Sequence, residues 1–368
     1  DSPEAAGLAP GVADAIDAVL ARGLASGAFP GASVAVGRGG VLVKLEGYGG
    51  LTDGGDPVTP DTPYDLASLT KVVATTSLAM RAAERGDLDL DAPVRDLVPT
   101  FRPIGGDAVT PRHLLSHTAG HRPFWPFFYH GMTPEAARAF IHADTLQRVP
   151  GERVVYSDFD MIVLGEALET ASGETLEALT QREVTGPLGM SDTEFRAVGS
   201  RDLRAAPTER DTLWRQRLLQ GEVHDEAAAL FGGVSGHAGL FSTARDMARF
   251  GFTMANGCTG YGHRLASGET LERFTRRVSA PGSHAMGLGW MLAPSARGEA
   301  EPMGRRMGPR TFGHTGFTGT SIWIDPDEDL FIVLLTNRIY PTRERRGIRA
   351  VRADLADAVA SRIVAPVR

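Results

Sequence analysis

The chain has 368 residues, which is enough for one large domain or two interlocked domains. Hydrophobic residues make up 42% and charged residues 23%, and the net charge of −7 is not gathered into runs of one sign. This composition gives no reason to expect nucleic acid or an anionic membrane as a partner. No apolar run of about 18 residues occurs, so the sequence predicts no transmembrane helix.

The sequence limits the redox chemistry and the processing of the chain. Cys258 is the single cysteine, so no intrachain disulfide is expected, and no cysteine-protease pattern surrounds it. The sequence begins at Asp1 without a methionine. We therefore expect that an upstream segment, either a signal peptide or an expression tag, was removed.

The first part of the chain predicts a helix, a hairpin and a second helix. Apolar residues recur with a spacing near 3.6 over 12–25, which is typical of a helix. Two β-type runs at 32–36 and 41–45 flank a Gly-Arg-Gly-Gly segment, which predicts a hairpin. After a polar turn region, residues 68–85 are helix-like and end at Gly86, a natural C-cap.

The rest of the chain places helices in the middle and strands at the end. Helical patterns such as 134–143 and 158–172 are interrupted by proline and glycine. Strand signals return at 321–324 and 330–335, and a last helix is expected over 349–364. The predicted fold is therefore α/β (α+β), with one antiparallel sheet from both chain ends, flanked by helices, and an inserted all-helical subdomain.

The predicted domain division follows the same pattern. We expect residues 1–66 and 235–368 to form the α/β sheet domain and residues 67–234 to form the mainly helical subdomain. The active site is expected in the cleft between them.

Ser68 and Lys71 form the first candidate site. Three residues apart on a helix, they share one face, and Ser68 falls in the first turn, where free backbone N–H groups favour negative charge. A serine hydroxyl needs a base, and a desolvated lysine can serve as one. The 38 basic residues include only two lysines, Lys44 and Lys71, so a lysine here suggests a chemical role that arginine cannot fill.

Two further motifs follow in order, Tyr156-Ser157-Asp158 and His314-Thr315-Gly316. With Ser68-x-x-Lys71 they resemble the serine β-lactamase and penicillin-binding protein superfamily, which includes class C β-lactamases, D,D-carboxypeptidases and family VIII esterases. The stretches HLLSHTAG from His113 and GHAGLFSTARDMARF from Gly236 are similar as well. The resemblance extends over about 30–340 and implies the β-lactamase/transpeptidase-like fold.

The resemblance also implies residue roles. Ser68 would be acylated, and Lys71 and Tyr156 would share the general acid and base work. Thr315 would face the substrate, and the backbone N–H groups of Ser68 and Phe317 would form the oxyanion hole. Gly316 would let a substrate backbone approach closely. No cofactor or metal is implied.

Two residues depart from the commonest family pattern. Asp158 stands where asparagine is usual, and its carboxylate would raise the pKa of Lys71 and keep it charged, which favours Tyr156 as the base. His314 stands where lysine is usual. It would be charged only at mildly acidic pH, which weakens the case for a dedicated β-lactamase.

Two histidine groups leave alternatives open. His113, His117 and His121 recur every fourth residue and would share a helix face as metal ligands, unless Gly120 ends the helix and their role is structural. The His224-Asp225-Glu226 run and His237 are a second polar group. They could bind a metal, serve as an alternative site of the Ser/His/Asp type, or form a hydrogen-bonded loop that supports the active site.

The stretch HRPFWPFFYH from His121 contains five aromatic residues out of ten. It could line an acyl-binding cleft for apolar or aryl groups, or pack over the helical subdomain, and both can hold together. Trp290, in the stretch GLGW, leaves the same two possibilities.

The predicted function is a serine hydrolase that forms a covalent acyl-enzyme with a small ester or amide, in first place a carboxylesterase or a D,D-peptidase-like enzyme. A β-lactamase acting on penicillins or cephalosporins is one alternative, and a non-catalytic penicillin-binding or scaffold protein is another. The resemblance favours export to the periplasm or cell envelope, with the cytoplasm as the alternative. The oligomeric state is left open.

Overall fold

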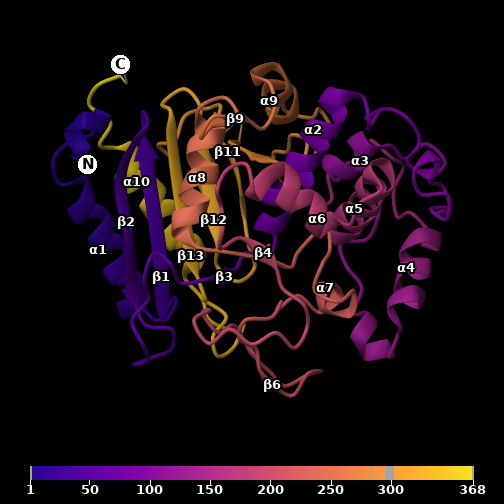
Figure 1. The fold of residues 1–368 in the computed structure, drawn as a ribbon, viewed down its shortest axis with the longest axis horizontal. Coiled ribbons are helices and arrows are strands. Elements are labelled where there is room, and N and C mark those ends of the chain that lie inside the picture. The colour runs from indigo at the N-terminus through magenta and orange to yellow at the C-terminus, as the bar shows by residue number, and fades with distance from the viewer. Residues whose placement is uncertain (1, 283, 295–301, 367–368) are drawn as a thin grey trace.

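A six-stranded antiparallel sheet with the order β10-β11-β12-β13-β1-β2 dominates one part of the molecule. The computed structural model describes residues 2–282, 284–294 and 302–366. The strands of this sheet are β1 (Gly31–Arg38), β2 (Val41–Gly49), β10 (Met291–Leu292), β11 (Phe312–Thr315), β12 (Ser321–Asp325) and β13 (Leu330–Thr336). In Figure 1 the indigo β1 lies beside the yellow β13, so the prediction of a sheet from both chain ends is confirmed.

Helices cover both faces of this sheet. The terminal helices α1 (Val12–Ala25) and α10 (Ile348–Ala360) pack together on one face, and α8 (Ala244–Ala255) lies on the other (Figure 1). Ile332 of β13 belongs to the hydrophobic cluster under α1 and α10, and its neighbour Val333 belongs to the cluster on the α8 side. Since both faces are buried, the central strands are continuous apolar runs.

The second part of the molecule is mainly helical. Its α-helices are α2 (Ser77–Arg85), α3 (Pro111–Leu115), α4 (Pro134–Ala143), α5 (Asp158–Ser172), α6 (Leu176–Thr180) and α7 (Glu226–Leu230), and α9 (Gly268–Thr275) packs beside α2. Two π-helical turns, η2 (Lys71–Thr76) and η5 (Gln181–Thr185), continue into or out of these helices. Short 3₁₀ turns are η1 (Pro3–Ala6), η3 (Val94–Asp96) and η4 (Phe127–His130).

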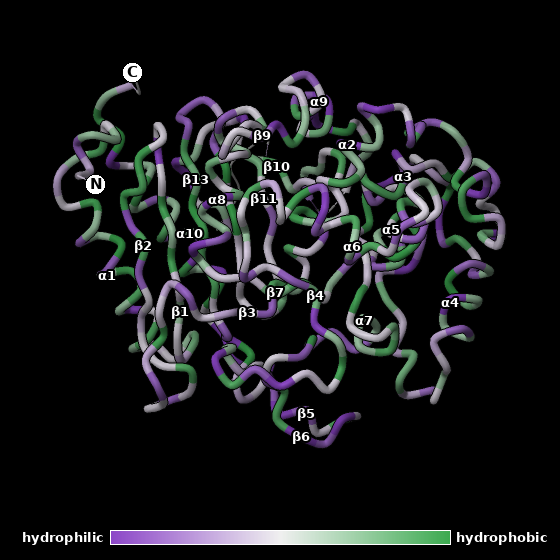
Figure 2. Tube along the Cα trace, in the orientation of Figure 1, coloured by the Kyte–Doolittle hydropathy of each residue, from purple (hydrophilic) through white to green (hydrophobic). Residues whose placement is uncertain are grey.

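Small sheets connect the two parts. The three-stranded sheet has the order β3-β7-β4 and consists of β3 (Tyr64–Asp65), β4 (Glu194–Phe195) and β7 (Leu240–Ser242). Two hairpins are formed by β5 (Arg210–Asp211) with β6 (Arg217–Leu218), and by β8 (Thr259–Gly260) with β9 (His263–Arg264). Figure 2 shows hydrophilic segments around β5 and β6. The strand β3 leads directly into the turn that carries Ser68.

Most predicted elements are present, and some have changed ends. The helices expected at 12–25, 134–143 and 158–172 are confirmed as α1, α4 and α5. The last helix ends at Ala360, four residues before the predicted end. The segment predicted as one helix to residue 85 contains the π-helical turn η2, and Gly86 closes it with a φ of +82° as expected.

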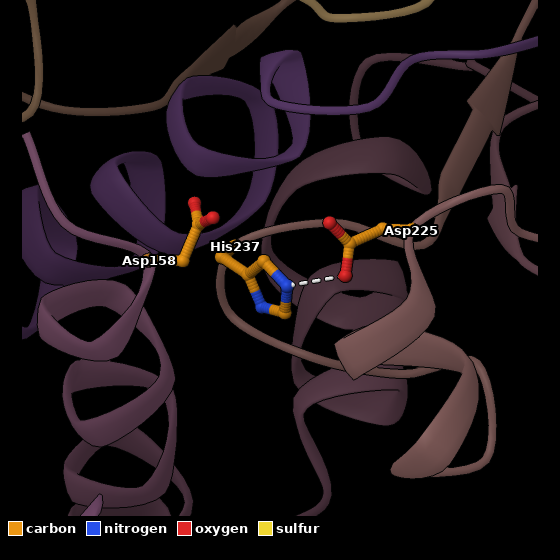
Figure 3. A group of neighbouring side chains, drawn as sticks. All are labelled: Asp158, Asp225 and His237. Carbon is orange, nitrogen blue, oxygen red and sulfur yellow. Dashed lines mark hydrogen bonds and ion pairs between the residues drawn. The ribbon is translucent and has the colours of Figure 1, made fainter. Parts of the chain in front are cut away.

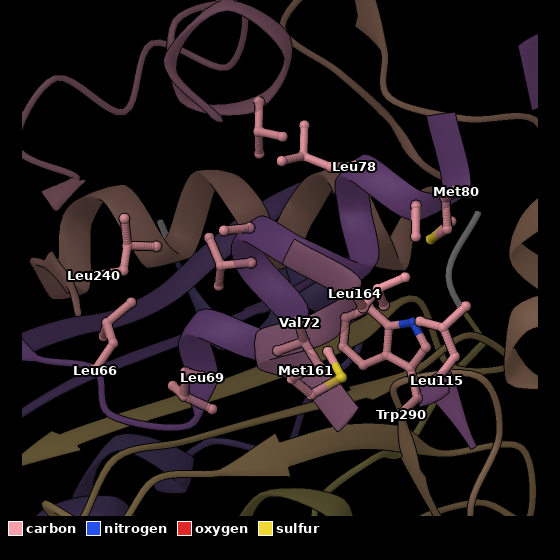
Figure 4. Close-up of a cluster of buried hydrophobic side chains, with 14 of the residues drawn as sticks. Leu66, Leu69, Val72, Leu78, Met80, Leu115, Met161, Leu164, Leu240 and Trp290 are labelled. Carbon is pink, nitrogen blue, oxygen red and sulfur yellow. The ribbon is translucent and has the colours of Figure 1, made fainter. Parts of the chain in front are cut away.

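One hydrophobic cluster continues from the sheet into the helical part. It joins Phe331 of β13 to Leu164 of α5, and Figure 4 shows the helical side of it around Trp290. Trp290 has no exposed surface and does not border the cavity described below, so its role is in the core.

The division into two domains at residues 66/67 and 234/235 stays a prediction. Among the described residues, no helix has the length and apolarity to cross a bilayer.

Candidate active site

Ser68 lies in the turn that joins β3 to the following helix. Ala67 before it has a φ of +47°, in the left-handed region that residues other than glycine rarely adopt. The carboxylate of Asp65 accepts a hydrogen bond from the Ala67 amide at 2.8 Å and supports this bend. Ser68 is half-buried and borders a large cavity. Such strained backbone is often found at functional sites.

Lys71, one turn further along, is buried among oxygen acceptors. Its Nζ donates to Ser68 Oγ at 2.9 Å and to the His237 carbonyl oxygen at 3.0 Å, and it is 2.8 Å from Asp158 Oδ1. These contacts use the three N–H donors of an ammonium group. Burial alone would lower the pKa of Lys71, but Asp158 and Tyr156 outweigh burial and raise it above its usual value. The expected effect of Asp158 on Lys71 therefore agrees with this geometry.

Tyr156 stands beside Lys71, between two histidine rings. Its ring centroid lies 5.1 Å from Lys71 Nζ, 4.6 Å from the His117 ring and 5.8 Å from the His314 ring. Burial raises the pKa of the Tyr156 phenol, while Lys71 and hydrogen bonds from Lys71 and Ser68 act to lower it. The net result is a raised pKa, so the phenol holds its proton at neutral pH.

The third motif approaches the site along the end of β11. Thr315, Gly316 and Phe317 border the cavity, and the Phe317 side chain is 47% exposed. His314 does not border it, because its ring is fully buried behind Tyr156, where Nδ1–H donates to the Thr315 carbonyl oxygen at 2.8 Å.

His314 corrects one expectation. Burial, followed by the charge of Lys71, lowers the pKa of His314 well below its usual value. The prediction that His314 becomes charged at mildly acidic pH is therefore wrong, because a cation next to Lys71 without access to water is strongly disfavoured.

Gly316 has a packing role that was not expected, and its expected role in the approach of a substrate backbone stays a prediction. A Cβ atom at this position would lie 2.1 Å from Thr320 Oγ1 and 2.6 Å from the Leu66 carbonyl oxygen. Glycine is therefore required for close packing of the third motif against the Ser68 turn. This reason differs from the predicted one, which was approach of the substrate backbone.

The amides of Ser68 and Phe317 are the expected oxyanion donors. Neither N–H takes part in a hydrogen bond found among the described residues. Both residues border the same cavity. The Thr318 and Thr320 hydroxyls donate to the carbonyl oxygens of Asp65 and Leu66 at 2.7 and 2.9 Å, which ties the two turns together. The arrangement suits an oxyanion that forms beside Ser68.

The cavity has a volume of about 1020 Å³, which is sufficient for a substrate of drug-like size. Its aromatic wall consists of Phe124, Trp125, Phe127, Phe128 and Tyr129. Phe124 and Tyr129 are 65% and 58% exposed, whereas Phe127 is buried and stacks on Phe159. The aromatic stretch therefore both lines the cavity and packs over the helical part.

The three histidines of the HLLSHTAG region do not share a helix face, because α3 ends at Leu115, before Gly120. His117 and His121 instead meet at Asp160, with Nδ1 to carboxylate distances of 3.2 and 2.7 Å. His113 contacts Thr110 at the start of α3. These contacts fit the structural alternative, in which His117 supports the ring of Tyr156.

The second polar group reaches Lys71 through the His237 carbonyl, whereas His224 contacts Glu209 and Glu226 contacts Arg343. His237 Nε2 is 2.8 Å from Asp225 Oδ1 (Figure 3). The other ring nitrogen, Nδ1, is 2.8 Å from Ser235 Oγ. Asp158, Asp225 and His237 offer ligand atoms within 4.8 Å of one another, so they could hold a cation. Each already has a protein partner, however, and Asp158 is paired with the ammonium of Lys71. This arrangement fits a hydrogen-bonded support for the site.

Cys258 has no part in this site. It is buried 3.8 Å from the Met254 sulfur, and burial raises the pKa of its thiol to about 12. A buried thiol with so high a pKa is unreactive.

Several supporting residues were missed by the sequence analysis. Thr318, Thr320 and Arg352 contact the two turns that carry Ser68 and Phe317. Thr318 and Thr320 follow Gly316 at every second position, and this spacing is the local signal from which they could have been found. Arg352 lies 36 residues beyond its partner Gly316 and gave no local signal.

Comparisons with known proteins agree with this geometry. The model of the β-lactamase family matches residues 16–357. A putative D-alanyl-D-alanine carboxypeptidase of Salmonella typhimurium is 34% identical over 332 residues, covering 81% of this chain and 76% of the relative.

Solved structures have the same fold. EstCE1, a hydrolase with promiscuous acyltransferase activity, is 25% identical and superposes with a TM-score of 0.76 over 95% of this chain and 98% of its own. The octameric penicillin-binding protein homologue of Pyrococcus abyssi is 24% identical, with a TM-score of 0.73 over 94% of this chain and 76% of its own. From the family match and the relatives, the chain belongs to the β-lactamase family and is a serine hydrolase of the β-lactamase and penicillin-binding protein superfamily.

Proposed function

We propose that Ser68 is the nucleophile and that this protein hydrolyses a small ester through a covalent Ser68 acyl-enzyme. The observation that carries the proposal is the 2.9 Å hydrogen bond from Lys71 to Ser68 Oγ, at the edge of a cavity bordered by Ser68 and Phe317, whose amides have no partner among the described residues. A serine held in this way, with donors for the developing oxyanion beside it, has the parts that acyl transfer requires.

In the first step, the proton of the Ser68 hydroxyl passes to the deprotonated oxygen of Tyr156 while Oγ forms a bond to the substrate carbonyl carbon. The carbonyl oxygen becomes an oxyanion that the amides of Ser68 and Phe317 stabilise. The bond to the leaving oxygen then breaks, and Tyr156 returns the proton to it. Water repeats the sequence, with Tyr156 taking its proton, and releases the acid and free Ser68.

Tyr156 is the proposed base because Lys71 is held in its charged form. Asp158 raises the pKa of Lys71, and each N–H of the ammonium has an oxygen acceptor. Lys71 then orients Ser68 and stabilises the phenolate of Tyr156. Since burial also raises the pKa of Tyr156, the reactive form becomes more populated as the pH rises.

The aromatic wall favours an apolar or aryl acyl group. Phe124 and Tyr129 present exposed rings to the cavity that begins at Ser68. A peptide ending in D-alanyl-D-alanine is the second candidate substrate, because a relative at 34% identity is named a putative carboxypeptidase for that group. β-Lactams are the third, since they carry the same reactive carbonyl.

The test is a substrate panel with wild-type protein and the Ser68→Ala variant. We expect p-nitrophenyl butyrate to be hydrolysed with a higher kcat/KM than nitrocefin or a D-Ala-D-Ala peptide. Ser68→Ala should lower kcat for every substrate by about 10³-fold or more. Full activity of Ser68→Ala would contradict the proposed nucleophile. Loss of wild-type activity with a chelator would favour a metal-dependent hydrolase. If none of the three substrates is turned over or acylates the protein, a non-catalytic binding protein is favoured.

A further inference from the structure

The peptide group between Gly316 and Phe317 has a cation at one end and the proposed oxyanion donor at the other. Its N–H belongs to Phe317 and has no partner found among the described residues. Its carbonyl oxygen, on Gly316, accepts a hydrogen bond from Arg352 Nη2 at 2.8 Å. The same nitrogen donates to the Thr320 carbonyl at 2.8 Å.

Arg352 carries a charge for which the described part of the chain provides no carboxylate partner. The residue comes from α10 and is 8% exposed, and within the described ranges no ion pair joins its guanidinium to a carboxylate. Its Nε is buried and has no hydrogen-bond partner in the part of the chain that the structure describes. Burial and the neighbouring Arg338 lower its pKa to about 9, so the cation persists at neutral pH.

A buried cation without a counter-ion is costly, and its interactions with nearby dipoles are correspondingly strong. A guanidinium bonded to an amide carbonyl draws electron density through the amide and makes its N–H a stronger donor. The N–H in question is the one that would meet the oxyanion. The effect grows as negative charge develops, so it acts on the transition state more than on the neutral substrate.

The turn that carries Phe317 is held in place by other contacts too. Thr318 and Thr320 tie it to the Ser68 turn, and the Gly316 amide donates to the Thr320 carbonyl at 2.7 Å. Loss of the charge at position 352 therefore leaves most of the local fold in place. The electrostatic effect of Arg352 can accordingly be separated from its packing.

We propose that Arg352 is a positioning residue for acyl transfer, which holds and polarises the Gly316–Phe317 peptide so that its N–H stabilises the oxyanion. The proposal rests on the proposed function, in which Phe317 and Ser68 supply the two donors. Removal of one such donor typically costs about 10²–10³ in kcat, and weakening it is expected to cost about tenfold.

Two variants keep a hydrogen-bond donor at this position and differ in charge, Arg352→Lys and Arg352→Gln. With p-nitrophenyl butyrate, a neutral substrate whose binding a cation barely affects, we expect kcat to fall about tenfold in Arg352→Gln and about threefold or less in Arg352→Lys, with KM within about twofold. Inhibition by phenylboronic acid, which forms a tetrahedral adduct on serine, should weaken in the same order.

Arg38→Gln is the matched control. Arg38 is fully buried and donates to the carbonyl oxygens of Ala6 and Ala365 at 2.6 and 2.9 Å, away from the cavity. This variant should lose thermal stability and keep the wild-type kcat when assayed well below its Tm. A purely structural role of Arg352 would instead give Lys and Gln variants with the same kcat, or losses that follow Tm.

The outcomes separate this inference from the proposed function. If Ser68→Ala abolishes turnover while Arg352→Gln keeps the wild-type kcat and boronic acid affinity, the role of Arg352 is overturned and Ser68 remains the nucleophile. If Ser68→Ala retains turnover, both fall. If the Gln variant does not fold, the Lys variant decides: a kcat loss of tenfold or more, despite the retained charge, would contradict the electrostatic role.

Discussion

At the scale of single residues, the scarcity of lysine was a useful but incomplete guide. Lys71 is buried against Ser68 and Asp158. Lys44, the other lysine, lies on β2, where it forms an ion pair with Asp17 of α1 at 2.7 Å, away from the site. Composition therefore indicated two candidates with equal weight, and only the spacing to Ser68 distinguished them.

Asp158 sets the charge state of the catalytic groups, and its removal gives a pH prediction. The carboxylate raises the pKa of both Lys71 and Tyr156. A base acts only when deprotonated, so kcat/KM should rise with pH toward a raised pKa. In Asp158→Asn one cause of that raised pKa is gone. We therefore expect the rising part of the profile of log kcat/KM against pH to move to lower pH.

The pH profile of kcat/KM with p-nitrophenyl butyrate measures this shift. Asp246→Asn is the control, because Asp246 is a buried carboxylate that bonds Thr193 Oγ1 at 2.9 Å, away from the cavity. It should lose stability without moving the rising part of the profile. If the rising part of the profile stays in place in Asp158→Asn, or moves to higher pH, the argument that Asp158 controls the pKa of the base is removed.

The sequence was sufficient for Ser68, Lys71 and Tyr156 as candidates because their motifs are local. It was not sufficient for the surroundings. The burial of the His314 ring behind Tyr156 depends on packing between β11 and the helical part, so its charge could not be predicted from the residue type. Arg352 reaches Gly316 only because α10 packs back on the sheet.

At the scale of elements, the turn after β11 and the turn after β3 form one unit. Gly316 lies where they touch, and a methyl group there would overlap Thr320 Oγ1 and the Leu66 carbonyl. We expect Gly316→Ala to lower stability by about 1–3 kcal/mol through overpacking and to lower kcat/KM for p-nitrophenyl butyrate, because Phe317 is displaced from Ser68.

Thermal unfolding and kcat/KM are measured for Gly316→Ala together with Gly268→Ala. Gly268 begins α9, has open space where a Cβ would go, and lies outside the cavity lining. The control should match the wild type in both quantities. A Gly316→Ala variant with wild-type Tm and kcat/KM would show that the contact between the two turns is unimportant.

Element ends depended on contacts that local patterns do not contain. The helices α4 and α5 were predicted to the residue, since Thr133 caps one and Gly173 closes the other. The π-helical turn η2 was not predicted, because its extra residue per turn has no signature in hydrophobic spacing. It begins at Lys71, where the buried ammonium contacts Asp158 of α5 and the His237 carbonyl in the turn before β7.

At the scale of the whole molecule, the sheet draws strands from both chain ends and the helical part is inserted between them. The alternation of strand and helix signals was enough to predict this architecture. The continuity of the core across both parts was not predicted, because Phe331 and Leu164 meet in one cluster only after folding. The proposed active site lies where this shared core reaches the cavity, which Ser68, Tyr156 and Phe317 all border.

The most direct measurement is the intact mass of the protein during turnover of p-nitrophenyl butyrate, followed by peptide mapping. The proposed mechanism predicts a transient mass increase of one butyryl group, located on the peptide that contains Ser68 and absent in Ser68→Ala. A butyryl group on another residue, or an adduct that persists in Ser68→Ala, would contradict the assignment of Ser68 as the nucleophile.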